Sequence, residues 1–154
     1  MKWTIQELTK LQNINNEFNE IVDLSSYIEN TDIIKISPVE INGSFEIYDD
    51  SLYEFYFDIK CTLILACAIT LVEVPYVIDI SVEEIFSKDL NDKYNNIDGI
   101  TIDLLPIIWS NIILEKPMRV LSKNAYENQE EEIVDLEQKD NINQAFANLK
   151  NYKK

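Results

Sequence analysis

Few side chains in this sequence are of the types that catalysis at neutral pH requires. The chain has no histidine, so a general base would have to be a carboxylate, a lysine or a cysteine with a shifted pKa. Two adjacent carboxylate pairs are present, Asp49–Asp50 and Glu83–Glu84. Neighbouring side chains on a strand point to opposite faces, so Glu83 and Glu84 should not share one site. We interpret both pairs as solvated surface.

The two cysteines, Cys61 and Cys67, do not form a metal-binding pattern. If one strand carries both at about 3.3 Å per residue, their thiols lie roughly 20 Å apart, too far to share a metal ion. We interpret them as core thiols. A stretch that starts like a calcium loop at Asp89 has Lys93 at a ligand position and Tyr94 where glycine is needed. The sequence therefore predicts no metal site, no cofactor and no enzymatic activity.

The charge of the chain limits the partners that it can bind. Among 154 residues, 28 are acidic and 13 are basic, which gives a formal net charge of -15. Such a surface repels the nucleic-acid backbone, and no basic patch with interleaved aromatic residues offsets it. Basic proteins or cations are the expected partners, and nothing in the sequence indicates direct contact with nucleic acid.

The distribution of apolar residues predicts a cytoplasmic protein that does not enter a membrane. The hydrophobic fraction of 46% is enough for the core of one domain. No apolar run reaches the roughly 20 residues of a membrane span, and the first residues do not form a secretory signal. Two cysteines in a domain of this size need no disulfide, which suits a reducing compartment. The oligomeric state is left open.

The first part of the chain predicts a helix and then strands. Thr4 and Glu7 form a capping-box pattern, which predicts a helix over residues 5–12. The stretch 13–24 fits either a helix or a strand. From Ile33 the apolar residues alternate, and Asn42–Gly43 is a strong turn signal, so we expect a short hairpin there.

The clearest pattern is a pair of long strands on either side of a turn near residues 66–70. The apolar face of the first contains Tyr53, Phe55, Phe57, Ile59, Cys61, Leu63 and Leu65. The apolar face of the second contains Val72, Val74, Tyr76, Ile78, Ile80 and Val82. Polar residues occupy the alternate positions, so we expect an antiparallel hairpin that is apolar on one side. That side needs a cover.

A strongly apolar segment near residue 110 predicts a helix over residues 104–115. Asp103 is the expected N-cap, Pro106 falls in the first turn, and Pro117 ends the helix. The helix has two apolar rows, Leu104/Ile108/Ile112 and Leu105/Trp109/Ile113. Either the helix covers the sheet with Trp109 in the core, or one exposed row is a docking surface.

The C-terminal part is acidic and then amphipathic. Residues 127–140 contain seven acids and one lysine, and the pattern of residues 141–154 predicts a short amphipathic helix. This part is either a solvated tail or a docking element. The candidate partner-binding residues of the whole chain are Asp103, Trp109, Glu115, Glu130, Glu131, Glu132, Phe146 and Leu149.

These elements predict an α+β fold with a largely antiparallel, curled sheet, and closure into a barrel is one alternative. We expect two or three helices and a C-terminal acidic tail. Residues 1–121 form the single α+β domain, and residues 122–154 form the acidic linker and the short amphipathic C-terminal helix.

Four segments in this order resemble the YceD family, described as large ribosomal RNA subunit accumulation proteins. They read MKWTIQEL (1–8), DIIKISPVEING (32–43), CTLILACAITLVEVP (61–75) and IDLLPIIWSNIILEKPMRV (102–120). Many relatives have Cys-x-Arg-Cys at the hairpin turn, where this chain has Cys67 and ends the motif with Thr70. The likeness covers nearly the whole chain and is greatest to the form found in Gram-positive bacteria.

The resemblance implies a cytoplasmic, non-enzymatic ribosome biogenesis factor that supports accumulation of the large-subunit (23S) rRNA. The family has no established catalytic residues to carry over. Together with the acidic surface, the resemblance makes a basic ribosomal protein or a pre-50S particle the expected partner. The alternative is a general protein–protein interaction module, or a homodimeric adaptor, that is unrelated to ribosomes.

Overall fold

A computed structural model describes residues 1–48, 51–89, 93–97 and 99–126 of the chain. The elements are β1 (Lys2–Thr4), α1 (Ile5–Gln12), β2 (Glu17–Val22), a 3-10 helix η1 (Ser25–Ile28), β3 (Ile33–Ile36), β4 (Val39–Ile47), β5 (Leu52–Ala66), β6 (Glu73–Ser87), β7 (Asn95–Asn96), β8 (Thr101–Asp103) and α2 (Leu105–Glu115). The α+β class is confirmed. The predicted tail helix and most of the acidic linker lie outside the described residues.

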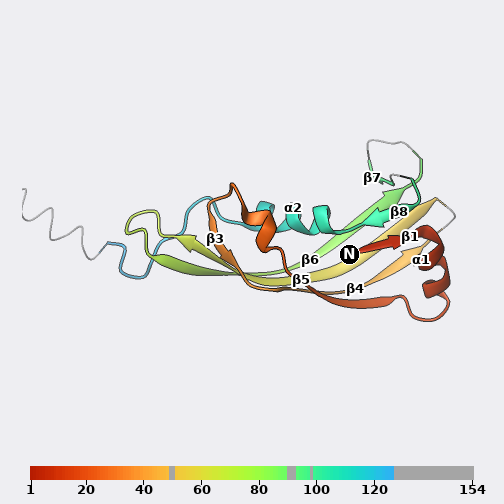
Figure 1. Cartoon of the computed structure of the whole chain (residues 1–154), viewed down its shortest axis with the longest axis horizontal. Helices are drawn as coiled ribbons and strands as arrows, with labels where there is room; N and C mark the ends of the chain where they lie inside the picture. Colours follow the sequence, from red (N-terminus) through yellow and green to blue (C-terminus); the bar gives the residue numbers. More distant parts are fainter. Residues whose placement is uncertain (49–50, 90–92, 98, 127–154) are drawn as a thin grey trace, which may run out of the picture.

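The main sheet is open rather than closed. Its strand order is β2-β4-β5-β6-β7, with β3 beside β5, and all of its pairs are antiparallel except β6–β7. Figure 1 shows the long strands bowed, with α2, η1, β1 and β8 on the concave side. Because these elements cover the apolar face, the sheet does not need to close on itself, and the barrel alternative is wrong.

The long hairpin is confirmed. β5 and β6 pair from Leu52 with Ser87 to Ala66 with Glu73. The predicted apolar face of β5 is buried along its whole length, whereas the same face of β6 is mostly half-buried. Val72 is an exception with 51% exposure, because it follows Leu71 in the turn rather than lying in β6.

The stretch that fitted a helix or a strand forms β2, and the hairpin predicted at Asn42–Gly43 is wrong. β4 runs straight through these residues, with Gly43 between Phe18 of β2 and Phe57 of β5. A Cβ atom at Gly43 would lie 2.4 Å from the carbonyl oxygen of Tyr56 and 2.5 Å from the Cβ of Phe57. This glycine therefore permits a close approach inside the sheet and does not make a turn.

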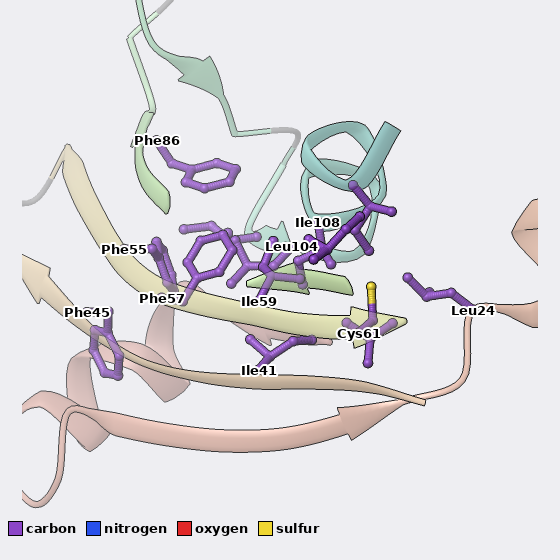
Figure 2. Close-up of a cluster of buried hydrophobic side chains, with 14 of the residues drawn as sticks. Leu24, Ile41, Phe45, Phe55, Phe57, Ile59, Cys61, Phe86, Leu104 and Ile108 are labelled. Atoms are coloured by element: carbon purple, nitrogen blue, oxygen red, sulfur yellow. The ribbon is translucent and has the colours of Figure 1, made fainter. Parts of the chain in front are cut away.

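The core lies between β5 and the elements on its concave side. Phe55 has no exposed surface and contacts Phe86 and Phe45, with ring centroids 5.5 and 5.9 Å apart respectively. In Figure 2, Leu104, the residue before α2, and Ile108 of α2 lie over Ile59 of β5. The helix is therefore the main cover of the sheet.

The N-terminus is joined to the start of α2. β1 pairs with β8, which sets Trp3 opposite Ile102, and the amide of Leu104 donates to the carbonyl of Met1 over 3.1 Å. α1 follows with the expected capping box: the Thr4 amide donates to the Glu7 carboxylate over 2.8 Å, and the Glu7 amide donates to the Thr4 hydroxyl over 3.3 Å. The prediction of this helix is confirmed.

Replacing Gly43 with alanine should destabilise the fold more than replacing Gly99. At Gly43 the clash is with backbone and a Cβ atom, which cannot swing away, and we expect a loss of about 2 kcal/mol in unfolding free energy. At Gly99, where φ is +68° and nothing lies within 4 Å, only backbone strain of about 1 kcal/mol opposes alanine. Urea unfolding of both variants measures the difference. Equal losses would contradict the role given to Gly43.

Candidate partner-binding surfaces

The start of α2 differs by one residue from its prediction. Leu104 occupies the N-cap, and Asp103 is the last residue of β8, opposite Lys2. The Asp103 carboxylate still accepts a hydrogen bond from the Leu105 amide over 3.0 Å. Asp103 therefore accepts a hydrogen bond from a backbone amide at the start of the helix. This half-buried carboxylate thus has a structural role, and it is less available to bind a partner.

The two apolar rows of α2 have different surroundings. Leu104, Ile108 and Ile112 have no exposed surface. The second row is half-buried, and its Trp109 packs against Tyr27 of η1 with ring centroids 5.6 Å apart. Trp109 is thus largely covered by an element that the sequence did not predict, which weakens it as a docking residue.

The exposed apolar residue of α2 lies outside both rows, at the C-terminal end. Leu114 is 81% exposed, and the neighbouring Glu115 is also exposed. The helix ends at Glu115, before Pro117, as expected. Glu115 is therefore the one candidate on this helix that lies at a free surface beside an exposed apolar side chain.

The side of the sheet that faces away from α2 is acidic, and we call it the outer face. Its acidic residues are Glu17 of β2, Glu40 and Glu46 of β4, Glu54 and Asp58 of β5, and Glu73, Asp79 and Glu83 of β6. Within these four strands the basic residue is Lys60, which pairs with Asp79 over 3.3 Å. A cation that approaches this face therefore meets a strongly negative potential.

The outer face contains an open depression of about 760 Å³. Small and polar residues, including Asn42, Gly43 and Ser81, form part of its lining, and Glu17 and Glu83 are two of its acids. The depression is wide open to solvent, unlike an enclosed cofactor site. Its size and charge suit lysine or arginine side chains of a partner.

Hydrogen bonds keep one carboxylate of this face ionised. Hydrogen bonds from the Tyr56 and Tyr48 hydroxyls lower the pKa of Glu54, although Glu54 is only 6% exposed. The same bonds raise the pKa of both tyrosines, because losing the phenolic proton would leave two negative groups in contact. The negative charge of Glu54 is therefore a fixed part of the outer face at neutral pH.

The adjacent pair Glu83–Glu84 is divided between the two faces, as predicted, but Glu84 is not simply solvated surface. Its carboxylate accepts from the side-chain amides of Asn95 over 2.6 Å and Asn111 over 3.3 Å. Glu84 thus joins β6, β7 and α2 on the concave side. The other pair, Asp49–Asp50, lies outside the described residues.

Both cysteines are free and buried, as predicted, and Cys67 holds the turn of the long hairpin. Its sulfur accepts from the amides of Ser122 over 3.3 Å and Thr70 over 3.5 Å. Hydrogen bonds from Thr70 lower the pKa of Cys67 to about 6, whereas burial raises the pKa of Cys61 to about 11. Cys67 has no exposed surface. Its hydrogen bond from Ser122 connects the hairpin turn to the segment that follows α2.

The remaining candidates were predicted on the C-terminal part. Glu130, Glu131, Glu132, Phe146 and Leu149 lie outside the described residues. Within the described ranges, no group of three acidic or sulfur ligands could hold a metal ion. Neither helix in those ranges is long and apolar enough to cross a membrane. The sequence indicated which acids point outward on each strand, but it did not predict the acidic outer face. Only the register of strand pairing brings these acids together on one surface.

Comparisons with known proteins agree with the resemblance. The model of the family described as large ribosomal RNA subunit accumulation protein YceD matches residues 55–153. A relative from Bacillus subtilis (strain 168), described as uncharacterized protein YlbN, is 36% identical over 133 residues, which are 82% of this chain and 77% of the relative. No solved structure matches this chain.

The two cysteines should give opposite pH dependences of stability. A folded pKa of about 6 for Cys67 lies below the unfolded value, so its hydrogen bonds add stability as pH rises from about 6 to about 9, and the penalty of Cys67→Ala should grow over this range. A folded pKa of about 11 for Cys61 lies above the unfolded value, so the penalty of Cys61→Ala should shrink above about pH 9. Urea unfolding of both variants between about pH 6 and about pH 11 tests both predictions. A penalty of Cys67→Ala that does not change with pH would refute the prediction for Cys67.

Proposed function

Since the chain belongs to the YceD family, described as large ribosomal RNA subunit accumulation protein, we propose that it is a non-enzymatic factor in assembly of the large subunit. We propose further that it acts by binding a basic ribosomal protein, free or on a pre-50S particle. The supply of large-subunit rRNA then depends on it through this partner. The cytoplasm is where such a factor works.

The acidic outer face is the observation that supports this choice of partner. Four neighbouring strands contribute eight acids to it, against Lys60 of β5 and Lys35 of the adjacent β3. Basic segments are attracted to such a surface over a Debye length, which speeds their capture and makes binding sensitive to salt. The same face repels RNA phosphates, so binding to a protein fits the charge better than direct binding to rRNA.

An apolar concavity at the hairpin turn favours a second candidate, a general interaction module or homodimeric adaptor. Leu71 and Met118 line this concavity, and their side chains are 77% and 103% exposed. Two copies of the chain could cover these residues on each other, although a net charge of -15 on each copy opposes association. A dimer in light scattering at physiological salt would favour this candidate.

Reversing charge on the outer face should abolish capture of the basic partner. We expect the wild-type chain to co-purify with a basic ribosomal protein or pre-50S particles at about 50 mM salt and to lose them above about 500 mM salt. The variant Glu17→Lys/Glu46→Lys/Asp58→Lys should retain at least about tenfold less at low salt. Mass spectrometry of the captured material provides the measurement.

A matched control separates the outer face from net charge. Glu20, Glu29 and Asp89 are exposed and lie off the outer face, so their combined lysine variant makes the same change in charge and should capture the partner nearly normally. Thermal unfolding checks that both triple variants fold. If nothing ribosomal co-purifies with the wild type, and depletion of the protein leaves large-subunit rRNA unchanged, the proposed function is wrong.

A further inference from the structure

Among the described residues, one long edge of the sheet has no strand paired with it. β5 covers one edge of β6 throughout, whereas on the other edge β7 pairs only with Phe86 and Ser87. From Glu73 to Ile85, no described strand and no backbone hydrogen bond outside the β5 ladder involves β6. The alternate N–H and C=O groups of this edge can therefore pair with another extended segment.

This edge is unusual in length. The free edge of β6 covers thirteen residues, whereas β2, at the opposite side of the sheet, has six. Short edge strands and prolines are common protections against unwanted pairing, and on β6 Pro75 provides one near the start. The stretch Tyr76–Ile85 contains no proline and is open for pairing over ten residues.

A groove runs beside this edge, between β6 and the end of α2. It has a volume of about 390 Å³ and is lined by Ile80, Val82 and Leu114 together with Glu83, Glu84 and Glu115. Leu114 is 81% exposed, although it is apolar. A strand added to β6 would thus find apolar side chains on the concave side and carboxylates at the rim.

We propose that the edge of β6 over Tyr76–Ile85 binds an extended basic segment of a partner protein as an additional strand. Because strand side chains alternate, apolar residues of that segment would face Ile80, Val82 and Leu114 in the groove. Its lysine or arginine residues would face Asp79 and Glu83 on the outer face. The proposal rests on the proposed function for the identity of the partner as basic.

Charge favours a basic segment over a second copy of this chain. Two β6 edges paired with each other would bring the Asp79 and Glu83 carboxylates of both copies together, with a net charge of -15 on each chain. Like charges across a strand pair destabilise it. A cationic segment instead gains both the ladder hydrogen bonds and the charge complementarity.

Peptides can test strand addition separately from simple charge attraction. The probe is a peptide of about ten residues that alternates arginine and valine, compared with two versions N-methylated on every arginine or on every valine. Each methylated version lacks the N–H groups of one edge. We expect one version to bind like the parent and the other at least about tenfold more weakly, since only one edge of the peptide pairs with β6.

Hydrogen exchange locates the peptide. Binding of the parent peptide should slow exchange of amides within Tyr76–Ile85 and leave those of β2 unchanged. If all three peptides bind equally, or if protection appears in β2, the contact is electrostatic only or lies elsewhere, and the proposal is wrong.

A pair of matched variants tests the groove. Leu114→Lys/Glu115→Lys should weaken binding of the parent peptide at least about tenfold, because it removes one apolar wall and reverses a charge at the rim. Ile14→Lys/Glu29→Lys makes the same change at two exposed positions outside the groove and should bind normally. All four positions are exposed, so both variants should fold. Equal effects of the two variants would overturn the role of the groove.

Two other segments that could occupy the edge of β6 would give different hydrogen-exchange results. Only the amides of Tyr76–Ile85 that do not donate to β5 report on this edge. If they exchange slowly in the free protein and dilution leaves this unchanged, residues 127–154 cover the edge; if their slow exchange disappears on dilution, a second copy covers it. Either result overturns the proposal.

If the outer-face variant loses the ribosomal partner but the methylated peptides do not differ, strand addition fails and the proposed function stands. If the methylated peptides differ but nothing ribosomal co-purifies, the edge binds basic strands and the proposed function fails.

Discussion

The buried face of β5 is the constraint on which the rest of the domain depends. Its inner side chains from Phe55 to Leu65 are almost fully buried, and each large apolar side chain contributes about 2 kcal/mol by leaving water. One edge of β5 pairs with β3 and β4, and the other pairs with β6. α2 then covers its inner face. Because the inner face fulfils the need for apolar burial, the outer face can carry many charged residues, and here these are mostly acidic.

The separation of the two faces explains how so acidic a chain contains so apolar a helix. The α2 sequence is apolar on nearly all sides because β5, η1 and β1–β8 surround most of it. Leu114 is the point where that cover ends. Charge and apolar surface therefore meet along the border between α2 and the edge of β6, which is where the strand-addition proposal places its partner.

Local signals predicted those elements that depend on local interactions. The capping box of Thr4 and Glu7 and the alternation over residues 53–82 correctly gave α1 and the long hairpin, because the cap and the pleat are fixed by neighbouring residues. The turn predicted at Asn42–Gly43 was wrong because a glycine can either form a turn or allow neighbouring strands to approach closely. Only the positions of Tyr56 and Phe57 distinguish the two cases. The acidic outer face and the open edge of β6 follow from pairing between distant strands, on which local sequence carries no information.

The ladder between β1 and β8 also sets the order in which the fold can be completed. Residues 2–4 pair with residues 101–103, whereas the strands of the long hairpin are separated by a turn of six residues. Closing a loop of about 100 residues costs more chain entropy than closing the hairpin, so the hairpin should form early and the β1 ladder late. During synthesis, which proceeds from the N-terminal side, β1 must therefore wait unpaired until residues 101–103 have been made.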